Sequence, residues 1–211
     1  MSKINYDDIS KYINTENKIG EGKEVSVYRV GEEVIKIFHV IRKTPIKRIS
    51  DEGLEKLSEL SLNCFITPNN LIILDGKIIG YTEKYLEEKE INFDNIDYDL
   101  IKEDIYTLSE EGFTIEDLLY NYIFTDGRLY FNDLTSYNYI KTEVDFLKKQ
   151  FLVKNTIIMN NFLIGLTLFD AFKKGETNEY TKMYLANEYR LEHCSDIFYG
   201  DYLKTENNKA K

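Results

Sequence analysis

The sequence has few of the residues that build metal centres and covalent cross-links. Its 211 residues include two cysteines, two histidines, two prolines and no tryptophan. Cys64 and Cys194 lie far apart, and His39 and His193 are equally isolated, so none of them has metal-ligand spacing. We therefore expect reduced thiols in a cytoplasmic protein, with neither a zinc site nor a disulfide framework.

The chain is also short of positive charge. It has 27 Lys and Arg against 37 Asp and Glu, and its net charge is −10. This balance disfavours a protein that binds DNA or RNA, because such a protein needs clustered Lys and Arg to cover the phosphates. A single nucleotide is not excluded, since one lysine, backbone amides and Mg²⁺ can meet its charge.

Secretory and membrane-spanning segments are not predicted. The first eight residues contain no apolar run of the kind found in signal peptides. The most apolar stretch, 156–172, is interrupted by Asn160, Asn161 and Asp170, which favours a buried helix over a membrane span. With 43% hydrophobic and 30% charged residues, the composition is that of a soluble globular chain.

What the sequence does contain is a glycine-rich turn followed by a lysine in an apolar strand. Gly20 and Gly22 lie in a polar turn, and a second alternating run carries Lys36 in its middle. Glycines let backbone N–H groups approach an anion, and a lysine in an apolar strand needs a negative partner. We therefore expect a phosphate-binding sheet here. The alternation predicts strands over residues 17–20, 25–30 and 33–39.

A capped helix and a hairpin are predicted next. Ser50, followed by two acidic residues, is typical of a helix N-terminus, and leucine spacing continues through Leu62. The basic segment before it, 41–48, is predicted to be a connector broken by Pro45. Further on, the Asp-Gly pair at 75–76 separates two apolar runs and predicts a β-hairpin.

A second hairpin carries two residues with oxygen ligands. An amphipathic helix over 99–111, stopped by Gly112, is predicted to precede it. Asn121 opens the first strand and Asp133 follows the second, with an Asp-Gly turn between the strands. We therefore expect Asn121 and Asp133 at the same end of this hairpin.

These features resemble the protein-kinase fold. Gly20, Gly22 and Val27 match the glycine loop G-x-G-x-x-G-x-V, although Val25 stands in place of the third glycine. Val34-Ile35-Lys36 corresponds to the V-A-I-K motif of the third strand.

The resemblance implies an α+β fold with two lobes. Residues 1–86 would form an N-lobe with a five-stranded antiparallel sheet and one helix, and 87–211 a reduced, mainly helical C-lobe. Helices are expected over 144–152, 157–172 and 180–189, and no A-P-E motif is present. The half of the fold that docks peptides therefore looks reduced.

The resemblance also implies an ATP site. The glycine loop and Lys36 would hold the phosphates, and backbone groups of Lys84 and Leu86 would face the adenine. Glu55 would steady Lys36, with Glu52 and Glu59 as alternatives. The register of the helix does not decide among these glutamates.

Metal and catalytic roles follow from the same resemblance. Asn121 and Asp133 resemble the Mg²⁺ ligands of H-R-D-x-x-x-x-N and D-F-G. The catalytic aspartate falls at Glu116, with Asp117 one place nearer the asparagine, and no His-Arg pair precedes either residue. Asp117 and Glu116 are therefore both candidate bases in a degenerate catalytic loop.

Three functions are compatible with the sequence. The first is an ATP- and Mg²⁺-dependent phosphotransferase that acts on a Ser/Thr hydroxyl or a small molecule. The second is a nucleotide-binding pseudokinase that serves as a regulatory interaction module. The third is a kinase-like fold that binds no nucleotide and serves as a structural or partner-binding protein. The sequence does not identify the substrate, the partner or the oligomeric state.

Overall fold

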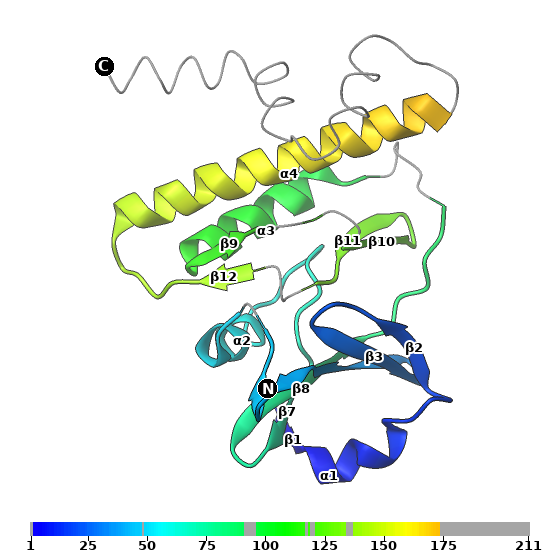
Figure 1. Cartoon of the computed structure of the whole chain (residues 1–211). Coiled ribbons are helices and arrows are strands. Elements are labelled where there is room, and N and C mark those ends of the chain that lie inside the picture. Colours follow the sequence, from blue (N-terminus) through cyan, green and yellow to red (C-terminus); the bar gives the residue numbers. More distant parts are fainter. Residues whose placement is uncertain are drawn as a thin grey trace, which may run out of the picture. The chain divides into compact units, whose positions relative to one another are not determined.

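The chain has a mixed α+β fold, seen in a computed structural model (Figure 1) that describes residues 2–47, 49–90, 96–116, 118, 121–133 and 137–173. It divides into two compact units, Met1–Leu152 and Val153–Lys211. Helix α4 (Asp145–Lys173) begins in the first unit and continues into the second. All residues of the candidate site lie in the first unit.

A six-stranded sheet forms the N-terminal half of the first unit, with strand order β1-β7-β8-β4-β3-β2. All neighbouring pairs are antiparallel except β1 and β7, which are parallel. The strands are β1 (Ser2–Asn5), β2 (Lys18–Glu21), β3 (Val25–Val30), β4 (Glu33–Phe38), β7 (Asn70–Leu74) and β8 (Lys77–Lys84).

The predicted five-stranded antiparallel sheet is therefore wrong by one strand. The five expected strands are present close to their predicted positions, and β1 adds a sixth at the edge. Its sequence, Ser-Lys-Ile-Asn, has too little apolar alternation to be recognised. Its strand conformation comes from pairing with β7, where Lys3 lies opposite Leu71.

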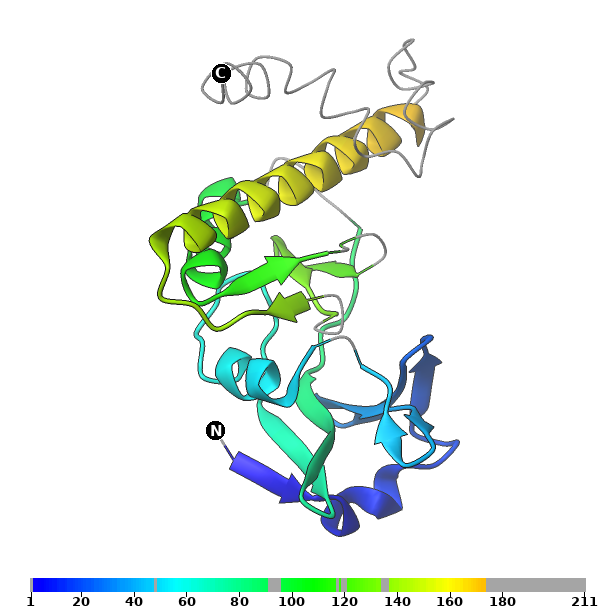
Figure 2. The same ribbon diagram turned by 60° about the vertical axis from the view of Figure 1, so that its left-hand side comes forward.

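The two faces of β4 have different surroundings. Ile35 points into an apolar cluster with Ile9, Ile72 and Ile79. This cluster is covered by α1 (Tyr6–Ile9) and the 3₁₀ turn Ser10–Tyr12, which lie on the opposite side of the sheet from α2 (Figures 1 and 2). The alternate residues of β4, including Lys36, face the other way because side chains alternate along a strand.

Helix α2 (Asp51–Leu57) begins where the sequence predicts, since the Ser50 side chain accepts a hydrogen bond from the Gly53 amide at 3.0 Å. The helix is shorter than predicted and ends before Leu62. The following residues are held instead by α3 (Tyr98–Glu110), whose Asp104 carboxylate accepts hydrogen bonds from the Asn63 backbone and side-chain nitrogens.

Helix α3 confirms the predicted helix and its stop. Asp97 caps its N-terminus by accepting a hydrogen bond from the Leu100 amide at 3.1 Å. Gly112 follows the helix with φ of 91°, a value that favours glycine. Short strands come next: β9 (Phe113–Ile115), β10 (Tyr122–Thr125), β11 (Arg128–Phe131) and β12 (Tyr137–Tyr139).

The β10–β11 hairpin is confirmed with its Asp-Gly turn. Asp126 and Gly127 both have positive φ, 50° and 76°, as a type I′ turn requires. The basic connector contains a small hairpin that was not predicted, β5 (Val40–Ile41) and β6 (Thr44–Pro45). In both hairpins the two turn residues have positive φ.

Two helices predicted within 144–172 are one continuous helix, α4. The residues between the two predicted helices, 153–156, include no Gly or Pro, whose low helix propensity would end a helix there. The predicted helix over 180–189 lies outside the described residues. None of the helices in the described ranges is long and apolar enough to cross a membrane. The division into lobes at residue 86 stays a prediction.

Candidate functional site

Lys36 lies at the centre of the candidate site. Its side chain is only 8% exposed, and its Nζ is 2.7 Å from Glu83 Oε1. The same ammonium donates a hydrogen bond of 2.5 Å to the backbone oxygen of Asn132, which is 96 residues away in the sequence. The strand lysine and the end of the β10–β11 hairpin therefore meet.

The register of the sheet lines up the predicted phosphate-binding residues. Gly20 on β2 is opposite Val27 on β3, Val27 is opposite Lys36, and Lys36 is opposite Tyr81 on β8. Directly opposed residues share one face of a sheet. Gly20, Val27 and Lys36 thus form one row across the sheet, facing the same side.

Glu83 is an unpredicted member of the site. It lies two residues beyond Tyr81 on β8 and so shares the face that carries Lys36. Burial raises the pKa of the Glu83 carboxyl, while the neighbouring Lys36 ammonium lowers it and Asp133 raises it further. Its second oxygen, Oε2, is buried and has no hydrogen-bond partner within the described part of the chain.

The predicted pairing of Glu55 with Lys36 is wrong. Glu55 Oε1 is 2.7 Å from Lys3 Nζ on β1. The two alternatives are not partners of Lys36 either: Glu52 is 3.6 Å from Lys141, and Glu59 is exposed. The ion pairs of the α2 glutamates therefore go to Lys3 and Lys141, and β8 supplies the carboxylate that pairs with Lys36.

Asn121 and Asp133 are held at the same end of their hairpin. The Phe131 amide donates to the Cys64 oxygen at 2.8 Å, and the Ile66 amide donates to the Phe131 oxygen at 2.9 Å. One residue further, the Asn132 amide donates to the Asn121 oxygen at 3.2 Å. The backbone therefore places both predicted metal ligands next to the peptide that Lys36 contacts.

Asp104 supports this arrangement from α3, and sequence reasoning missed it. Its buried carboxylate accepts hydrogen bonds from the amides of Asn63, Cys64 and Phe65, the shortest being 2.6 Å from Cys64. Phe65 then stacks on Phe131, with ring centroids 4.7 Å apart. An acidic residue on the apolar face of a predicted helix was the available signal.

Cys64 is an inert part of the same segment. Burial, with a smaller contribution from Asp104, raises the pKa of its thiol to about 12. A thiol with such a pKa is almost fully protonated at neutral pH and therefore a poor nucleophile. Cys64 is free of disulfide bonding, while Cys194 and His193 lie outside the described residues.

The glycines of the turn are not required by the fold. A Cβ on Gly20 would lie 3.8 Å from Val27, and one on Gly22 would lie 3.7 Å from Val25, both ordinary van der Waals contacts. Neither glycine has positive φ. Packing therefore does not explain why these positions lack a side chain, whereas a ligand that approaches the backbone would.

His39, which follows β4, contacts the glycine-rich turn and the start of β3. Its ring nitrogens lie 3.1 Å from the Lys23 oxygen and 3.1 Å from Ser26 Oγ. The His39 amide also donates to the Glu24 oxygen at 2.8 Å. These contacts fix the turn from the strand that carries Lys36.

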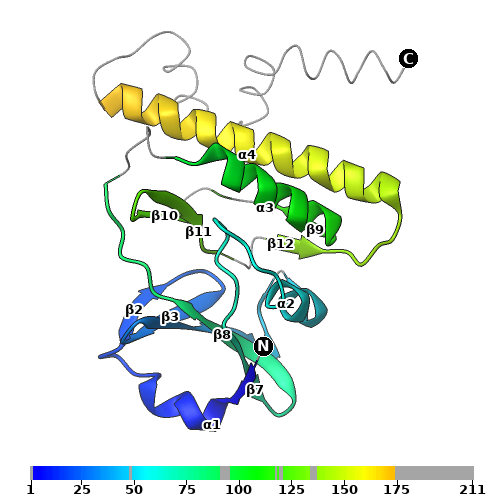
Figure 3. The same ribbon diagram turned by 180° about the vertical axis from the view of Figure 1, so that it is seen from behind.

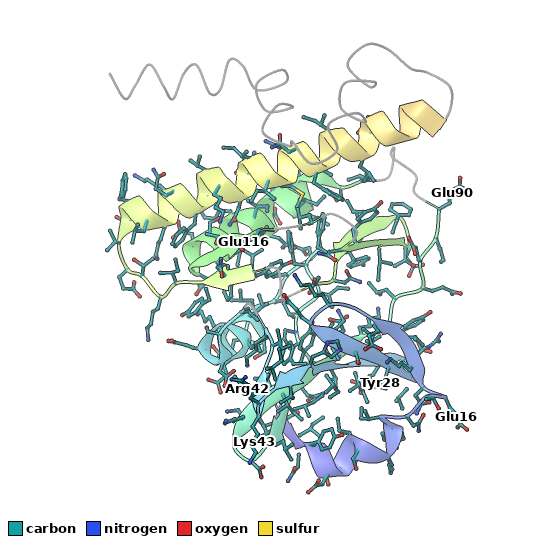
Figure 4. All side chains as sticks on the ribbon, in the orientation of Figure 1. Glu16, Tyr28, Arg42, Lys43, Glu90 and Glu116 are labelled. Carbon is teal, nitrogen blue, oxygen red and sulfur yellow. The ribbon has the colours of Figure 1, made fainter. Side chains whose placement is uncertain are left out.

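The predicted base and the predicted adenine-binding residues are placed only in part. Glu116 follows β9, is exposed, and accepts a hydrogen bond from the Asn138 side chain (Figure 4). Asp117 lies outside the described residues. Lys84 and Leu86 border a pocket of about 220 Å³ whose other lining residues lie in 62–69 and at Tyr130. Their contact with adenine stays a prediction.

A larger pocket of about 440 Å³ is lined by residues of α2, the end of α3, β12, the segment after it and the first turn of α4. Figure 3 shows where these elements lie in the fold. Six glutamates and three lysines line it. Such an acidic lining repels phosphate groups, so this pocket does not suit a nucleotide. The Lys36 site has the more suitable charges.

The chemistry of the Lys36 site fits a phosphate with a divalent cation. An ammonium has three N–H donors, and within the described residues Lys36 donates to Glu83 and Asn132, leaving one for an anion. The described ranges contain no group of three or more His, Cys, Asp or Glu able to hold a metal. Asn121 and Asp133 alone suit Mg²⁺, which takes few protein ligands when phosphates complete its shell.

Comparison with known proteins identifies no family. No protein-family model and no curated protein matches the chain. Among solved structures, the Legionella pneumophila Lpg2603 kinase bound to IP6 is similar at 18% identity with a TM-score of 0.34, covering 74% of this chain and 78% of that one. A second structure of the Lpg2603 kinase gives 18% identity and a TM-score of 0.31, covering 88% and 87%. TM-scores of this size do not establish a shared fold.

Proposed function

We propose that this chain is a small protein-kinase-like protein that binds ATP and Mg²⁺ between the sheet and the β10–β11 hairpin. The observation that carries the proposal is the position of Lys36, whose ammonium contacts Glu83 and the peptide before Asp133. A buried cation beside two oxygen ligands is suited to the triphosphate of a nucleotide.

Different residues would bind the phosphates, the metal ion and the adenine. The remaining N–H of Lys36 and the backbone at Gly20 and Gly22 would contact phosphate oxygens. Asn121 and Asp133 would hold Mg²⁺, which when bound neutralises charge on the phosphates. Backbone groups of Lys84 and Leu86 would contact the adenine.

In the phosphotransferase form of the proposal, Asp117 or Glu116 accepts the proton of an acceptor hydroxyl. The hydroxyl oxygen, from Ser/Thr or a small molecule, forms a bond to the γ-phosphorus as the bond to the bridging oxygen breaks, and ADP leaves. Most of the rate enhancement would come from positioning and charge stabilisation.

The second candidate is a nucleotide-binding pseudokinase that regulates a protein partner. The contact of Glu116 with Asn138 favours it, because a carboxylate engaged by a neighbouring amide is less available as a base. In either form we place the protein in the cytoplasm, where the free thiol of Cys64 would stay reduced.

A thermal-shift titration with ATP tests the binding site. ATP at about 100 times its Kd should stabilise the wild-type protein by about 2.7 kcal/mol. Asp133→Asn should lose most of the additional shift that Mg²⁺ produces. No shift with ATP, with or without Mg²⁺, would contradict both forms of the proposal.

Transfer of labelled γ-phosphate separates the two forms. A phosphotransferase should label an acceptor. Asp133→Asn should abolish the label, and so should whichever of Asp117→Asn and Glu116→Gln removes the base. A protein that binds ATP but transfers no label in any form would be a pseudokinase. Equal transfer by the wild type and Asp133→Asn would place the active centre elsewhere.

A further inference from the structure

The carboxylate that pairs with Lys36 comes from the same sheet as the lysine. Lys36 on β4 and Glu83 on β8 lie on neighbouring antiparallel strands and on one face. Their charged atoms are 2.7 Å apart, and their side chains are 8% and 4% exposed. An ion pair this short and this dry constrains both side chains.

The approach of the two strands is itself tightly constrained. A Cβ on Gly80 of β8 would lie 2.2 Å from the Lys36 backbone oxygen, so only glycine lets the strands meet here. The main chain of Lys36 is therefore held against β8 by the hydrogen bonds of the ladder, at a distance that only a glycine at position 80 permits. The side chain of Glu83 then reaches Lys36 from within this rigid ladder.

Helix α2 takes no part in holding the ammonium. Its Glu55 is paired with Lys3 of β1, and both side chains are about half exposed, at 41% and 52%. A displacement of α2 would break that outer pair and leave the Lys36–Glu83 pair untouched. This contrasts with the arrangement implied by the resemblance, in which a helix glutamate completes the site.

We propose that Glu83 is the residue that positions Lys36 for its phosphate ligand, and that the sheet thereby keeps the lysine in its binding position independently of helix α2. The proposal rests on the proposed nucleotide-binding function. Glu83 is a positioning residue: it acts through Lys36 and contacts no ligand in this account. The site is consequently assembled before any ligand or partner arrives.

Matched variants test this role. Glu83→Gln keeps the size of the side chain and removes its charge, and Glu55→Gln makes the same change on α2. We expect Glu83→Gln to weaken ATP binding at least about tenfold, because a charge-assisted contact is replaced by a neutral one. Glu55→Gln should change the Kd less than about twofold, since its pair is exposed, and Glu83→Asp should recover part of the loss.

A second measurement does not depend on ATP. In ¹⁵N-labelled protein without ligand, the Lys36 ammonium should give a protected Nζ resonance, assigned by its loss in Lys36→Met. The resonance should persist in Glu55→Gln and broaden or disappear in Glu83→Gln, while circular dichroism shows that both variants remain folded. If Glu83→Gln unfolds, Glu83→Asp replaces it: the shorter carboxylate keeps the charge but reaches Lys36 less well, so the resonance should weaken without disappearing.

The outcomes separate the two proposals. If the wild type binds no ATP but the Nζ resonance depends on Glu83, the nucleotide function fails and the positioning of Lys36 stands. If Glu55→Gln weakens ATP binding or the resonance as much as Glu83→Gln does, the positioning role is overturned. It is also overturned if Glu83→Gln leaves both readouts unchanged.

Discussion

At the scale of single residues, burying the Lys36–Glu83 pair is unfavourable in free energy, and removing one partner is more unfavourable still. Taking both charges out of water costs several kcal/mol per ion, and a short contact with further hydrogen bonds recovers most of that. Removing one partner leaves the other charge uncompensated. A pair of this kind is thus weak evidence for stability and better explained by a requirement for charge at this position.

A double-mutant cycle checks the pairing. Lys36→Met and Glu83→Gln should each lower the free energy of unfolding by about 3–5 kcal/mol. The double variant should lose less than the sum, with a coupling of about 0.5–3 kcal/mol. Urea denaturation measures all four proteins, and additive losses would show that the two side chains do not interact.

Lys36→Met should also change how stability depends on pH. Without the lysine, only burial and the nearby Asp133 act on Glu83, and its pKa rises further above the ordinary value of 4.5. The unfolded chain releases this proton at lower pH than either folded protein, so both lose stability as the pH rises above 4.5. The variant should go on losing stability, relative to wild type, above the pH at which the wild-type Glu83 carboxyl has ionised. Stability that instead increased relative to wild type over this range would contradict the burial of Glu83.

Asp104 should matter for stability more than any other acid on α3. Asp104→Asn removes the charge that accepts hydrogen bonds from three successive backbone amides, and should cost about 1.5–3 kcal/mol. Glu103→Gln, on the exposed side of the same helix, should change stability by less than about 0.5 kcal/mol. Equal losses in the two variants would mean that Asp104 does not anchor residues 63–65.

Residues of the site differ in how far sequence reveals them. Lys36 could be predicted because a charge inside an apolar strand is visible in the local pattern. Glu83 could not, because Thr-Glu-Lys at the end of a strand resembles ordinary exposed sequence, and its burial depends on packing from distant segments. Glu55 was chosen by resemblance, and the structure pairs it with Lys3 of a strand that the sequence did not predict.

At the scale of elements, the glycines of the chain fall into two kinds. Gly80 is required by the fold, because its Cβ would collide with the backbone of β4. Gly20 is not, because its Cβ would make only ordinary contacts. This difference fits a structural role for Gly80 and the proposed ligand-binding role for Gly20.

Two alanine substitutions test the difference. Gly80→Ala should destabilise the protein by about 1–3 kcal/mol through overpacking. Gly20→Ala should leave the free energy of unfolding within about 0.5 kcal/mol of wild type and weaken ATP binding, because the Cβ holds the phosphates away from the backbone. Thermal unfolding with and without ATP measures both effects, and loss of stability in Gly20→Ala without loss of binding would reverse the assignment.

Elements with strong local signals were predicted correctly. Both Asp-Gly hairpins, the Ser50 cap of α2 and the Gly112 stop after α3 are encoded by a few neighbouring residues. Strand β1 and the length of α4 were missed, because the first depends on pairing with β7 and the second on continuity across a polar stretch. Helix α2 ends early because Asp104, more than 40 residues away, holds the chain that follows it.

At the scale of the whole molecule, charge limits the range of ligands. A net charge of −10 should prevent binding to a long phosphate backbone, while one nucleotide can be bound by a few local groups. We expect no binding of a 20-base-pair duplex at micromolar protein and physiological salt, measured by fluorescence anisotropy. Binding under these conditions would contradict the proposed class of ligand.

The proposed function depends most on whether a nucleotide binds beside Lys36. A crystal structure of the protein grown with a non-hydrolysable ATP analogue and Mg²⁺ tests this directly. We predict a phosphate oxygen within hydrogen-bond distance of Lys36 Nζ and a metal ion bound by Asp133. An analogue bound at another surface, with Lys36 still contacting only Glu83 and Asn132, would contradict the central claim.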